Sequence, residues 1–207
     1  MNTSNILNEL KLEKKEEAML KRYSGLVLGA NKEFNLISKN TESSIWERHI
    51  YDSAQLIDLF PKNTKSFCDV GSGAGFPGLV LKIIDSSLEG YLVEPIKKKA
   101  DFLKNATKQI GAEVNVIQEK YQNIKNTHAL SSDIITARAL MPLSGLLDLF
   151  SHNIIKGTIG IFPKGRSWEK EISDAQAHWK IDYNLFTSKT SKDSRIIIVD
   201  GLKRYEQ

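Results

Sequence analysis

The residues best suited to chemistry lie in one glycine-rich stretch, residues 69–78, with the sequence DVGSGAGFPG. Closely spaced glycines let a backbone approach a ligand and adopt positive φ angles. The stretch stands between an apolar run and a helical pattern, and open parallel sheets bind ligands beyond the ends of their strands. A purely structural turn rarely needs so many glycines. We therefore interpret Gly71, Gly73 and Gly75 as residues that contact a cofactor.

Glu94 ends the next apolar run, residues 90–93, and could complete a nucleoside site. A carboxylate at this position can accept hydrogen bonds from both hydroxyl groups of a ribose. The pattern leaves two cofactors open, because residues 73–78 also satisfy the G-x-G-x-x-G spacing of dinucleotide-binding proteins. Asp69 ahead of the loop, and Pro77, which lacks the N–H that a pyrophosphate would use, favour S-adenosylmethionine over NAD.

Alternating apolar and helical runs predict the scaffold that must position these residues. The predicted strands are 66–70, 90–93, 114–118, 133–137 and 158–163, and the helices between them are 77–84, 96–110 and 142–152. Such alternation predicts a parallel sheet covered by helices on both faces. Beyond Ser167, a helix to about Trp179 and two strands, 181–187 and 195–201, joined by a polar turn over 188–194, predict a C-terminal antiparallel hairpin. The fold class is therefore α/β, with a mostly parallel seven-stranded sheet.

Two amphipathic helices are predicted ahead of the first strand. Residues 6–28 carry apolar side chains mostly at three- and four-residue steps. A second helix is expected to start near Ser44, which forms an S-x-x-E capping box with Glu47, and to end at Pro61. No convincing linker follows. We expect residues 1–62 to form an N-terminal helical extension packed on a methyltransferase-type domain of residues 63–207.

Composition indicates one globular unit of 207 residues, 41% hydrophobic and 26% charged. The sequence contains no run of about 18 uncharged apolar residues and no signal-peptide pattern, so we expect a cytoplasmic protein without a membrane span. Residues 1–60 carry 8 Lys and Arg against 9 Asp and Glu, so the net charge of +4 arises downstream. This excess is compatible with a phosphate-bearing substrate but is weaker than that of a dedicated nucleic-acid-binding domain.

Thiol and metal chemistry are not indicated. The single cysteine, Cys68, lies in an apolar run and is predicted to be a buried core residue. His128, His152 and His178 show no metal-ligand spacing with one another or with Cys68, so we predict no catalytic metal.

Three further segments, together with the glycine loop, resemble a known family. They are residues 34–38 (FNLIS), 48–53 (RHIYDS) and 137–139 (ARA), in order and with family-like spacing within roughly residues 31–201. The sequence resembles the bacterial small-subunit ribosomal RNA guanine-7-methyltransferase family, also called glucose-inhibited division protein B. The resemblance implies a class I (Rossmann-like) methyltransferase fold, S-adenosylmethionine as the methyl donor, and 16S ribosomal RNA or the small ribosomal subunit as the substrate.

The resemblance also implies a set of cofactor contacts. Glu94 would hold the ribose, Phe76 would line the site and Arg138 would close it. Tyr121 and Gln122 would flank the adenine, although the family usually has carboxylates there, so backbone contacts are the firmer expectation. The complete expected set is Gly71, Gly73, Gly75, Phe76, Glu94, Tyr121, Gln122 and Arg138.

The implied reaction requires that the base and the methyl donor be positioned, and it does not require acid–base catalysis. Ring nitrogen 7 of guanine carries an in-plane lone pair and no proton, so methyl transfer to it needs no general base, only in-line alignment and electrostatic support. The sequence accordingly shows no obvious carboxylate dyad or nucleophile set. The residues expected to position the RNA base are Asn35, Arg48, His49, Lys164 and Arg195.

Two other functions stay open from the sequence. One is an enzyme of the same fold and cofactor that methylates a small molecule or a protein. The other is a non-catalytic module that binds a dinucleotide. For the ribosomal RNA methyltransferase, we expect a monomer.

Overall fold

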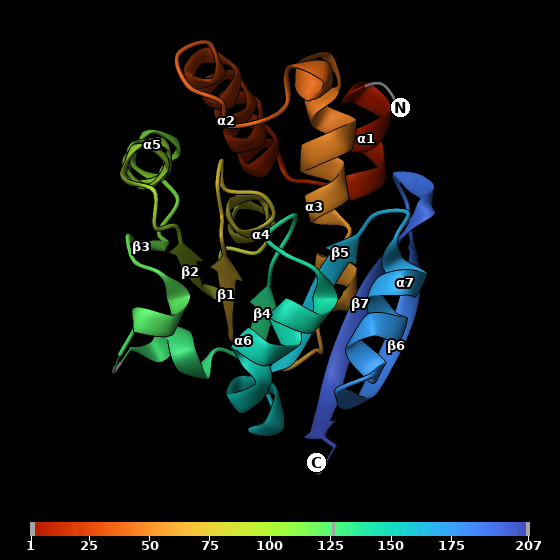
Figure 1. Cartoon of the computed structure of the whole chain (residues 1–207). Helices are drawn as coiled ribbons and strands as arrows, with labels where there is room; N and C mark the ends of the chain where they lie inside the picture. Colours follow the sequence, from red (N-terminus) through yellow and green to blue (C-terminus); the bar gives the residue numbers. More distant parts are fainter. Residues whose placement is uncertain (1–2, 126, 206–207) are drawn as a thin grey trace.

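The computed structural model describes residues 3–125 and 127–205, which form one seven-stranded sheet between two layers of helices (Figure 1). The strand order is β3-β2-β1-β4-β5-β7-β6, and β7 runs antiparallel to both of its neighbours. The predicted mostly parallel sheet with a terminal hairpin is confirmed. The strands are β1 (Ser66–Val70), β2 (Glu89–Val93), β3 (Asn115–Ile117), β4 (Ile134–Thr136), β5 (Ile159–Lys164), β6 (Trp179–Ser188) and β7 (Ser191–Arg204).

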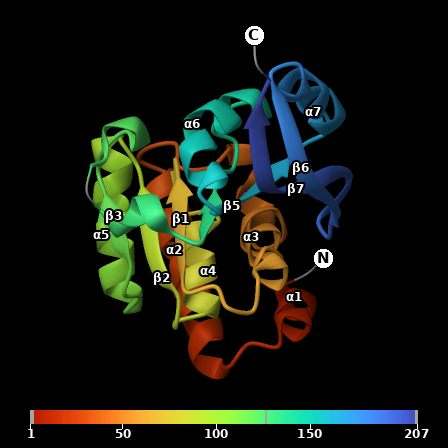
Figure 2. The same ribbon diagram turned by 90° about the horizontal axis from the view of Figure 1, so that it is seen from below.

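Helices cover both faces of the sheet, as predicted. One face packs against α4 (Gly78–Ile84) and α5 (Lys97–Ile110), and the other against α6 (Leu143–Ile155) and α7 (Trp168–Gln176). Figure 2 shows α5 beside β3 at one end of the sheet and α7 beside the β6–β7 hairpin at the other. Among the helices of the described chain, none combines the length and apolar character that a membrane crossing needs.

Successive residues of β1 enter two separate hydrophobic cores, as the two-residue period of a strand requires. Phe67 packs in the core under α4 and α5, and Cys68 packs in the core under α6. The predicted burial of Cys68 is confirmed, and this burial raises the pKa of its thiol.

The first predicted helix, over residues 6–28, is wrong in its extent, because the structure divides it into α1 (Thr3–Leu10) and α2 (Lys14–Asn31). Lys11 has a φ of 50°, a left-handed conformation that ends a right-handed helix. The Glu16 side chain then accepts a hydrogen bond from the Glu13 backbone N–H at 2.8 Å, which starts the second helix. The apolar spacing lapses over the charged residues 13–17, which was the available signal of a break.

The second predicted helix is a succession of short turns. They are the 3-10 helix Lys39–Ser44, the π-helical stretch Trp46–Tyr51, α3 (Asp52–Ala54) and the 3-10 turn Ile57–Leu59. The capping box expected from Ser44 is wrong, because the Ser44 hydroxyl donates to the Thr41 carbonyl oxygen of the preceding turn at 3.4 Å. π-helical stretches are rare and concentrate at functional sites. This one carries Arg48 and His49.

The N-terminal helices pack on the helical layer of the sheet. Tyr23 and Val27 of α2 are fully buried and share one hydrophobic cluster with Leu79 of α4 and Leu103 of α5. Burying side chains of this size contributes about 1.5–3 kcal/mol each. The helices that precede the sheet are therefore held by the same core as α4 and α5.

The terminal hairpin has a tighter turn than predicted. The polar segment 188–194 was expected to be a turn, but β6 ends at Ser188 and β7 begins at Ser191. The register shifts from the pair Thr187–Arg195 to the pair Ser188–Ser191, so residues 192–194 are a bulge in β7 that has no partner in β6. The register places Arg195 of β7 opposite Lys164 of β5.

Two helical glycines provide a test of this packing. A Cβ on Gly78, the first residue of α4, would lie 2.4 Å from Leu92 Cδ2 and 2.7 Å from Asp69 Cβ. Gly78→Ala should therefore lower the free energy of unfolding by about 1–3 kcal/mol. Gly25, inside α2, has no neighbour within 4 Å of such a Cβ, so Gly25→Ala should raise it by about 0.5–1 kcal/mol. Equilibrium unfolding in urea measures both changes, and a destabilised Gly25→Ala protein would contradict the packing described.

Candidate active site

The glycine loop leaves β1 at the point where the strand order reverses. β1 pairs with β2 on one side and with β4 on the other, and Asp69 faces Thr136 in this register. Gly71 and Arg138 therefore follow the ends of two neighbouring parallel strands. Open α/β sheets bind their ligands in the crevice at this point.

Hydrogen bonds within the loop define its shape. Gly71, Gly73 and Gly75 have φ angles of 73°, 58° and 102°, which favour glycine. The Ser72 hydroxyl donates to the Asp69 carbonyl oxygen at 2.8 Å, and the Gly75 N–H donates to the Ser72 carbonyl oxygen at 2.7 Å. The loop is thus a turn closed by its own backbone.

Glu94 lies against the loop at the carboxyl end of β2 and is 3% exposed. Its Oε2 accepts a hydrogen bond from the Gly73 N–H, and its Oε1 accepts one from the Ile96 N–H, both at 2.8 Å. A carboxylate has about four acceptor positions, so about two are left for the hydroxyl groups of a ribose. Ile96, which is 52% exposed, adds an apolar surface beside them. These residues fit a nucleoside cofactor.

The Phe76 ring packs against side chains of the N-terminal segment and of Arg138. It is buried, its ring centroid lies 5.0 Å from that of His49 and 5.2 Å from that of Tyr23, and the Arg138 guanidinium lies 5.5 Å from it. The Tyr23 hydroxyl also donates to the Ala74 carbonyl oxygen at 2.7 Å. Phe76 therefore connects the loop to Arg138 and to the N-terminal helices.

Tyr121 and Gln122 lie in a 3-10 turn after β3. The Tyr121 ring is buried and packs edge-on against Phe150, with centroids 4.9 Å apart. Its hydroxyl has no hydrogen-bond partner in the described part of the chain. Gln122 is exposed. The Tyr121 side chain faces the core, which leaves the backbone of this turn and Gln122 for a ligand.

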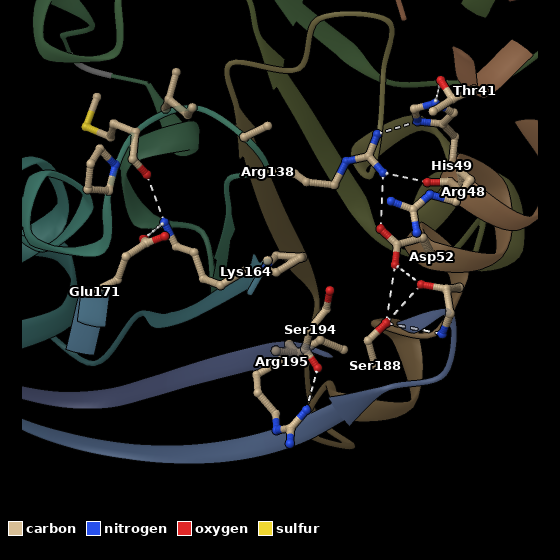
Figure 3. Close-up of a pocket in the computed structure, with 18 residues that line it drawn as sticks. Thr41, Arg48, His49, Asp52, Arg138, Lys164, Glu171, Ser188, Ser194 and Arg195 are labelled. Atoms are coloured by element: carbon tan, nitrogen blue, oxygen red, sulfur yellow. Dashed lines mark hydrogen bonds and ion pairs between the residues drawn. The ribbon is translucent and has the colours of Figure 1, made fainter. Parts of the chain in front are cut away.

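A cavity of about 510 Å³ adjoins the loop, and Figure 3 shows the side chains around it. Leu140 connects the two spaces, because it lines the cavity and would lie 2.7 Å, through its Cδ1, from a Cβ on Gly71. The lining residues are Thr41, Arg48, His49, Asp52, Arg138–Pro142, Pro163–Gly165, Glu171, Ser188, Thr190 and Ser194–Ile196.

The cavity brings together four of the five residues expected to position a base, Arg48, His49, Lys164 and Arg195. Asn35 is exposed and does not line this cavity. Asn35 lies in the segment that follows α2. The buried side chain of Asn31 holds this segment, because its Oδ1 accepts hydrogen bonds from the backbone N–H groups of residues 36 and 37 at 2.7 and 2.9 Å.

Three groups hold the Arg138 guanidinium. Its Nη1 donates to the Arg48 carbonyl oxygen and to Asp52 Oδ2, both at 3.2 Å, and its Nη2 donates to His49 Nδ1 at 2.9 Å. His49 Nε2 lies 2.8 Å from Thr41 Oγ1. Burial and the Arg138 charge lower the pKa of His49 to about 4. His49 is therefore neutral near pH 7 and orients Arg138.

Asp52, which sequence reasoning did not single out, connects Arg138 to the β6–β7 turn. Its Oδ1 accepts hydrogen bonds from Thr190 Oγ1 at 2.6 Å, Gln55 Nε2 at 3.0 Å and Ser188 Oγ at 3.5 Å. Asp52 lies within the segment 48–53, so this motif could have identified it as a site residue.

Lys164 and Glu171 form a second paired site on the opposite wall. Lys164 Nζ lies 2.9 Å from Glu171 Oε2 and donates to the Met141 carbonyl oxygen at 2.8 Å. The Glu171 carboxylate also accepts hydrogen bonds from the Leu143 N–H at 2.9 Å and from Ser167 Oγ at 3.0 Å. Burial lowers the pKa of Lys164. Burial also acts to raise the pKa of Glu171, but the Lys164 charge and the hydrogen bonds lower it overall.

Two arginines add positive charge at the cavity without a carboxylate partner among the described residues. Arg195 stacks over the Trp168 ring at 5.1 Å and donates only to backbone carbonyl oxygens. Arg48 is exposed, and its side chain makes no hydrogen bond to the described residues. This arrangement suits a phosphate backbone at the cavity mouth. Within the described ranges, no group of three or more His, Cys, Asp or Glu could hold a metal ion.

Asp69 lies beneath the loop and is a buried titratable group. Its Oδ1 accepts a hydrogen bond from Thr136 Oγ1 at 2.9 Å, and its Oδ2 accepts one from the Gly78 N–H at 3.2 Å. Burial raises the pKa of Asp69 to about 6, although these hydrogen bonds act to lower it.

Because the pKa of Asp69 is raised in the folded protein, the free energy of unfolding should fall as the pH rises. The unfolded carboxyl has a pKa of about 3.9, so between about pH 4 and 6 the folded protein holds a proton that the unfolded chain has lost. The resulting stabilisation is present below about pH 4 and is lost as pH rises through about 6. Relative to Asp69→Asn, the wild type should lose about 2–3 kcal/mol of unfolding free energy between pH 4 and pH 7. Urea unfolding at both values measures this, and parallel pH profiles would contradict it.

Comparisons with known proteins agree with this geometry. The sequence profile of rRNA small subunit methyltransferase G matches residues 16–198. The Ribosomal RNA small subunit methyltransferase G of Ruegeria pomeroyi is 34% identical over 95% of this chain and 97% of its own length. That of Rhodospirillum centenum is 38% identical over 86% of this chain and 81% of its own. The crystal structure of a SAM dependent methyltransferase from Aquifex aeolicus, 13% identical, aligns with a TM-score of 0.57 over 75% of this chain and 92% of that one, which shows a shared fold.

Proposed function

Since the chain belongs to the rRNA small subunit methyltransferase G family, we propose that it transfers a methyl group from S-adenosylmethionine to ring nitrogen 7 of a guanosine in 16S ribosomal RNA. The observation that carries this proposal is the position of Arg138, which contacts Phe76 of the glycine loop and lines the cavity. A cofactor on the loop and a base in the cavity would thus share one wall. Family membership does not favour a small-molecule or protein substrate, or a non-catalytic dinucleotide-binding module.

The proposed cofactor contacts are of two kinds, side-chain hydrogen bonds and close approach of the loop backbone. S-adenosylmethionine, when bound, supplies a methyl group on a positively charged sulfur. Glu94 would accept the ribose hydroxyl groups, and Gly71 and Gly73 would let the loop backbone approach. Gly75 supports the loop differently, since a Cβ there would lie 2.7 Å from the Tyr23 hydroxyl. We assign Gly75 to packing rather than to direct contact.

The proposed work of the cavity is to hold the base and exclude water. Nitrogen 7 has no proton to remove, so His49, neutral and with both ring nitrogens in contact with partners, serves to orient Arg138. Arg48 and Arg195 would contact phosphates near the base. Lys164 would keep the opposite wall in place through Glu171 and the Met141 carbonyl oxygen.

We further propose that residues 1–62 are a helical extension packed on a methyltransferase domain of residues 63–207. The protein would act as a monomer in the cytoplasm, where its RNA substrate is made, and would need no metal for the transfer. The burial of α2 side chains against α4 and α5 supports the packed extension.

The direct test measures transfer of labelled methyl from S-adenosylmethionine to ribosomal RNA from cells that lack this gene. We expect incorporation into small-subunit RNA and a single 7-methylguanosine when the product is mapped. RNA from cells that carry the gene is the matched control and should accept little label. No transfer to either RNA, or transfer to another base atom, would contradict the proposal.

A further inference from the structure

Two carboxylates line the cavity, Asp52 and Glu171, and they lie on opposite walls (Figure 3). Asp52 accepts three hydrogen bonds on Oδ1, from Thr190, Gln55 and Ser188, and one on Oδ2 from Arg138, so the position left on Oδ2 lies beside the Arg138 guanidinium. Its function is to hold Arg138 and the β6–β7 turn.

Glu171, in contrast, accepts three hydrogen bonds. Lys164 and the Leu143 N–H both bind Oε2, and the exposed Ser167 hydroxyl binds Oε1. Oε1 therefore keeps about one acceptor position that no described residue fills. The negative charge of Glu171 is retained, because its partners lower the pKa of its carboxyl.

A base that is read in such a cavity needs an acceptor of this kind. Enzymes that act on a base in RNA take it out of its stack and read it by hydrogen bonds to its Watson–Crick edge. Guanine differs from adenine at this edge by presenting a ring N–H and an exocyclic 2-amino group, which are both donors. Arg48, Arg138, Lys164 and Arg195 have no acceptor atom in their side chains.

The placement of Glu171 suits the orientation that transfer to nitrogen 7 demands. The segment 138–142 runs along the cavity, and its Leu140 lies against Gly71 of the loop. The carbonyl oxygen of Met141 accepts a hydrogen bond from Lys164, and Lys164 also pairs with Glu171. Figure 3 shows Lys164 and Glu171 across the cavity from Arg138 and His49. Nitrogen 7 and the 2-amino group lie on opposite edges of guanine, so a base whose amino group meets Glu171 turns its nitrogen 7 away from that wall.

We infer that Glu171 is the base-specificity residue, whose Oε1 accepts a hydrogen bond from the 2-amino group of the target guanine. This inference rests on the proposed function. Glu171 then has two tasks, since it also anchors Lys164 at the base of the same wall.

The test combines a change in the residue with a change in the substrate atom. The acceptor guanosine, located with the wild-type enzyme, is replaced by inosine, which lacks only the 2-amino group. For the wild type, we expect kcat/KM to be about 10- to 100-fold lower on the inosine RNA, the usual range for a lost hydrogen bond to a charged group. In Glu171→Gln the carbonyl oxygen must face Lys164 and the Leu143 N–H, which places the amide NH₂, a donor, at the position of Oε1. For this variant we therefore expect the two RNAs to differ by less than about threefold.

Glu169→Gln, an exposed change on the same helix, is the matched control and should discriminate as the wild type does. Equal discrimination by wild type and Glu171→Gln would overturn the inference and leave Glu171 as an anchor for Lys164. A wild type that methylates both RNAs equally would also overturn it, whether or not the variant folds. Failure of the wild type on the guanosine RNA would instead contradict the proposed function.

Discussion

Arg138→Lys is expected to lower kcat/KM for methylation of ribosomal RNA by about 100- to 1,000-fold, the effect of losing one preorganised donor group in an active site. The guanidinium reaches the Arg48 carbonyl oxygen, Asp52 and His49 at once. A lysine ammonium is a point charge without this planar fork, so it cannot hold all three. The loss of the guanidinium would also remove its contact with the Phe76 ring.

The measurement is the initial rate of methyl transfer at varied RNA concentration. Arg22→Lys, an exposed change on α2, should retain wild-type kinetics. Circular dichroism and thermal unfolding would show whether the Arg138 variant is folded, and calorimetry with S-adenosylhomocysteine would show how much of the loss lies in cofactor binding. Less than fivefold loss of kcat/KM in a folded Arg138→Lys protein would contradict the role given to this residue.

Glu94→Gln is expected to weaken binding of S-adenosylhomocysteine by about 100-fold or more. The wild-type carboxylate already accepts hydrogen bonds from the Gly73 and Ile96 N–H groups, and the amide NH₂ would oppose one of these donors. It would also remove an acceptor for a ribose hydroxyl group. Each hydrogen bond to a charged group contributes about 1.5–3 kcal/mol, so losing the charge and one contact accounts for this magnitude.

Isothermal titration calorimetry measures this affinity directly. Glu113→Gln, an exposed change in the turn before β3, removes the same charge and should leave the dissociation constant unchanged. A Glu94→Gln protein that binds S-adenosylhomocysteine as tightly as the Glu113 variant would show that Glu94 only supports the loop. It would then remove the assignment of the ribose to this residue.

The sheet could be predicted from sequence because buried parallel strands are continuous apolar runs. The run 66–70 matches β1 at both ends, and the other strands were placed within a few residues. The N-terminal helices were harder, because the break between α1 and α2 is set by the backbone conformation of a single residue. Lys11 ends α1 by its backbone conformation, and the π-helical stretch Trp46–Tyr51 keeps an apolar spacing close to that of an α-helix.

The site was predictable in its residue types and less so in its contacts. The loop, Arg48, His49 and Arg138 were named from motifs, and Glu94, Lys164 and Arg195 from their positions at the ends of predicted strands. Asp52 and Arg138 are 86 residues apart in sequence, so their pairing depends on tertiary packing that no local motif encodes. The side chain of Phe76 posed a similar difficulty, because a motif cannot tell which side of the loop a ring occupies.

The β6–β7 turn completes the cavity from the far end of the chain. Thr190 and Arg195 line it, and the Lys189 N–H donates to Gln55 Oε1 at 2.8 Å, so the turn also holds the N-terminal segment. A nascent chain can form β1 to β4 and the glycine loop early in its synthesis. It cannot close the cavity until the segment around Arg195 has emerged from the exit tunnel of the ribosome that is making it.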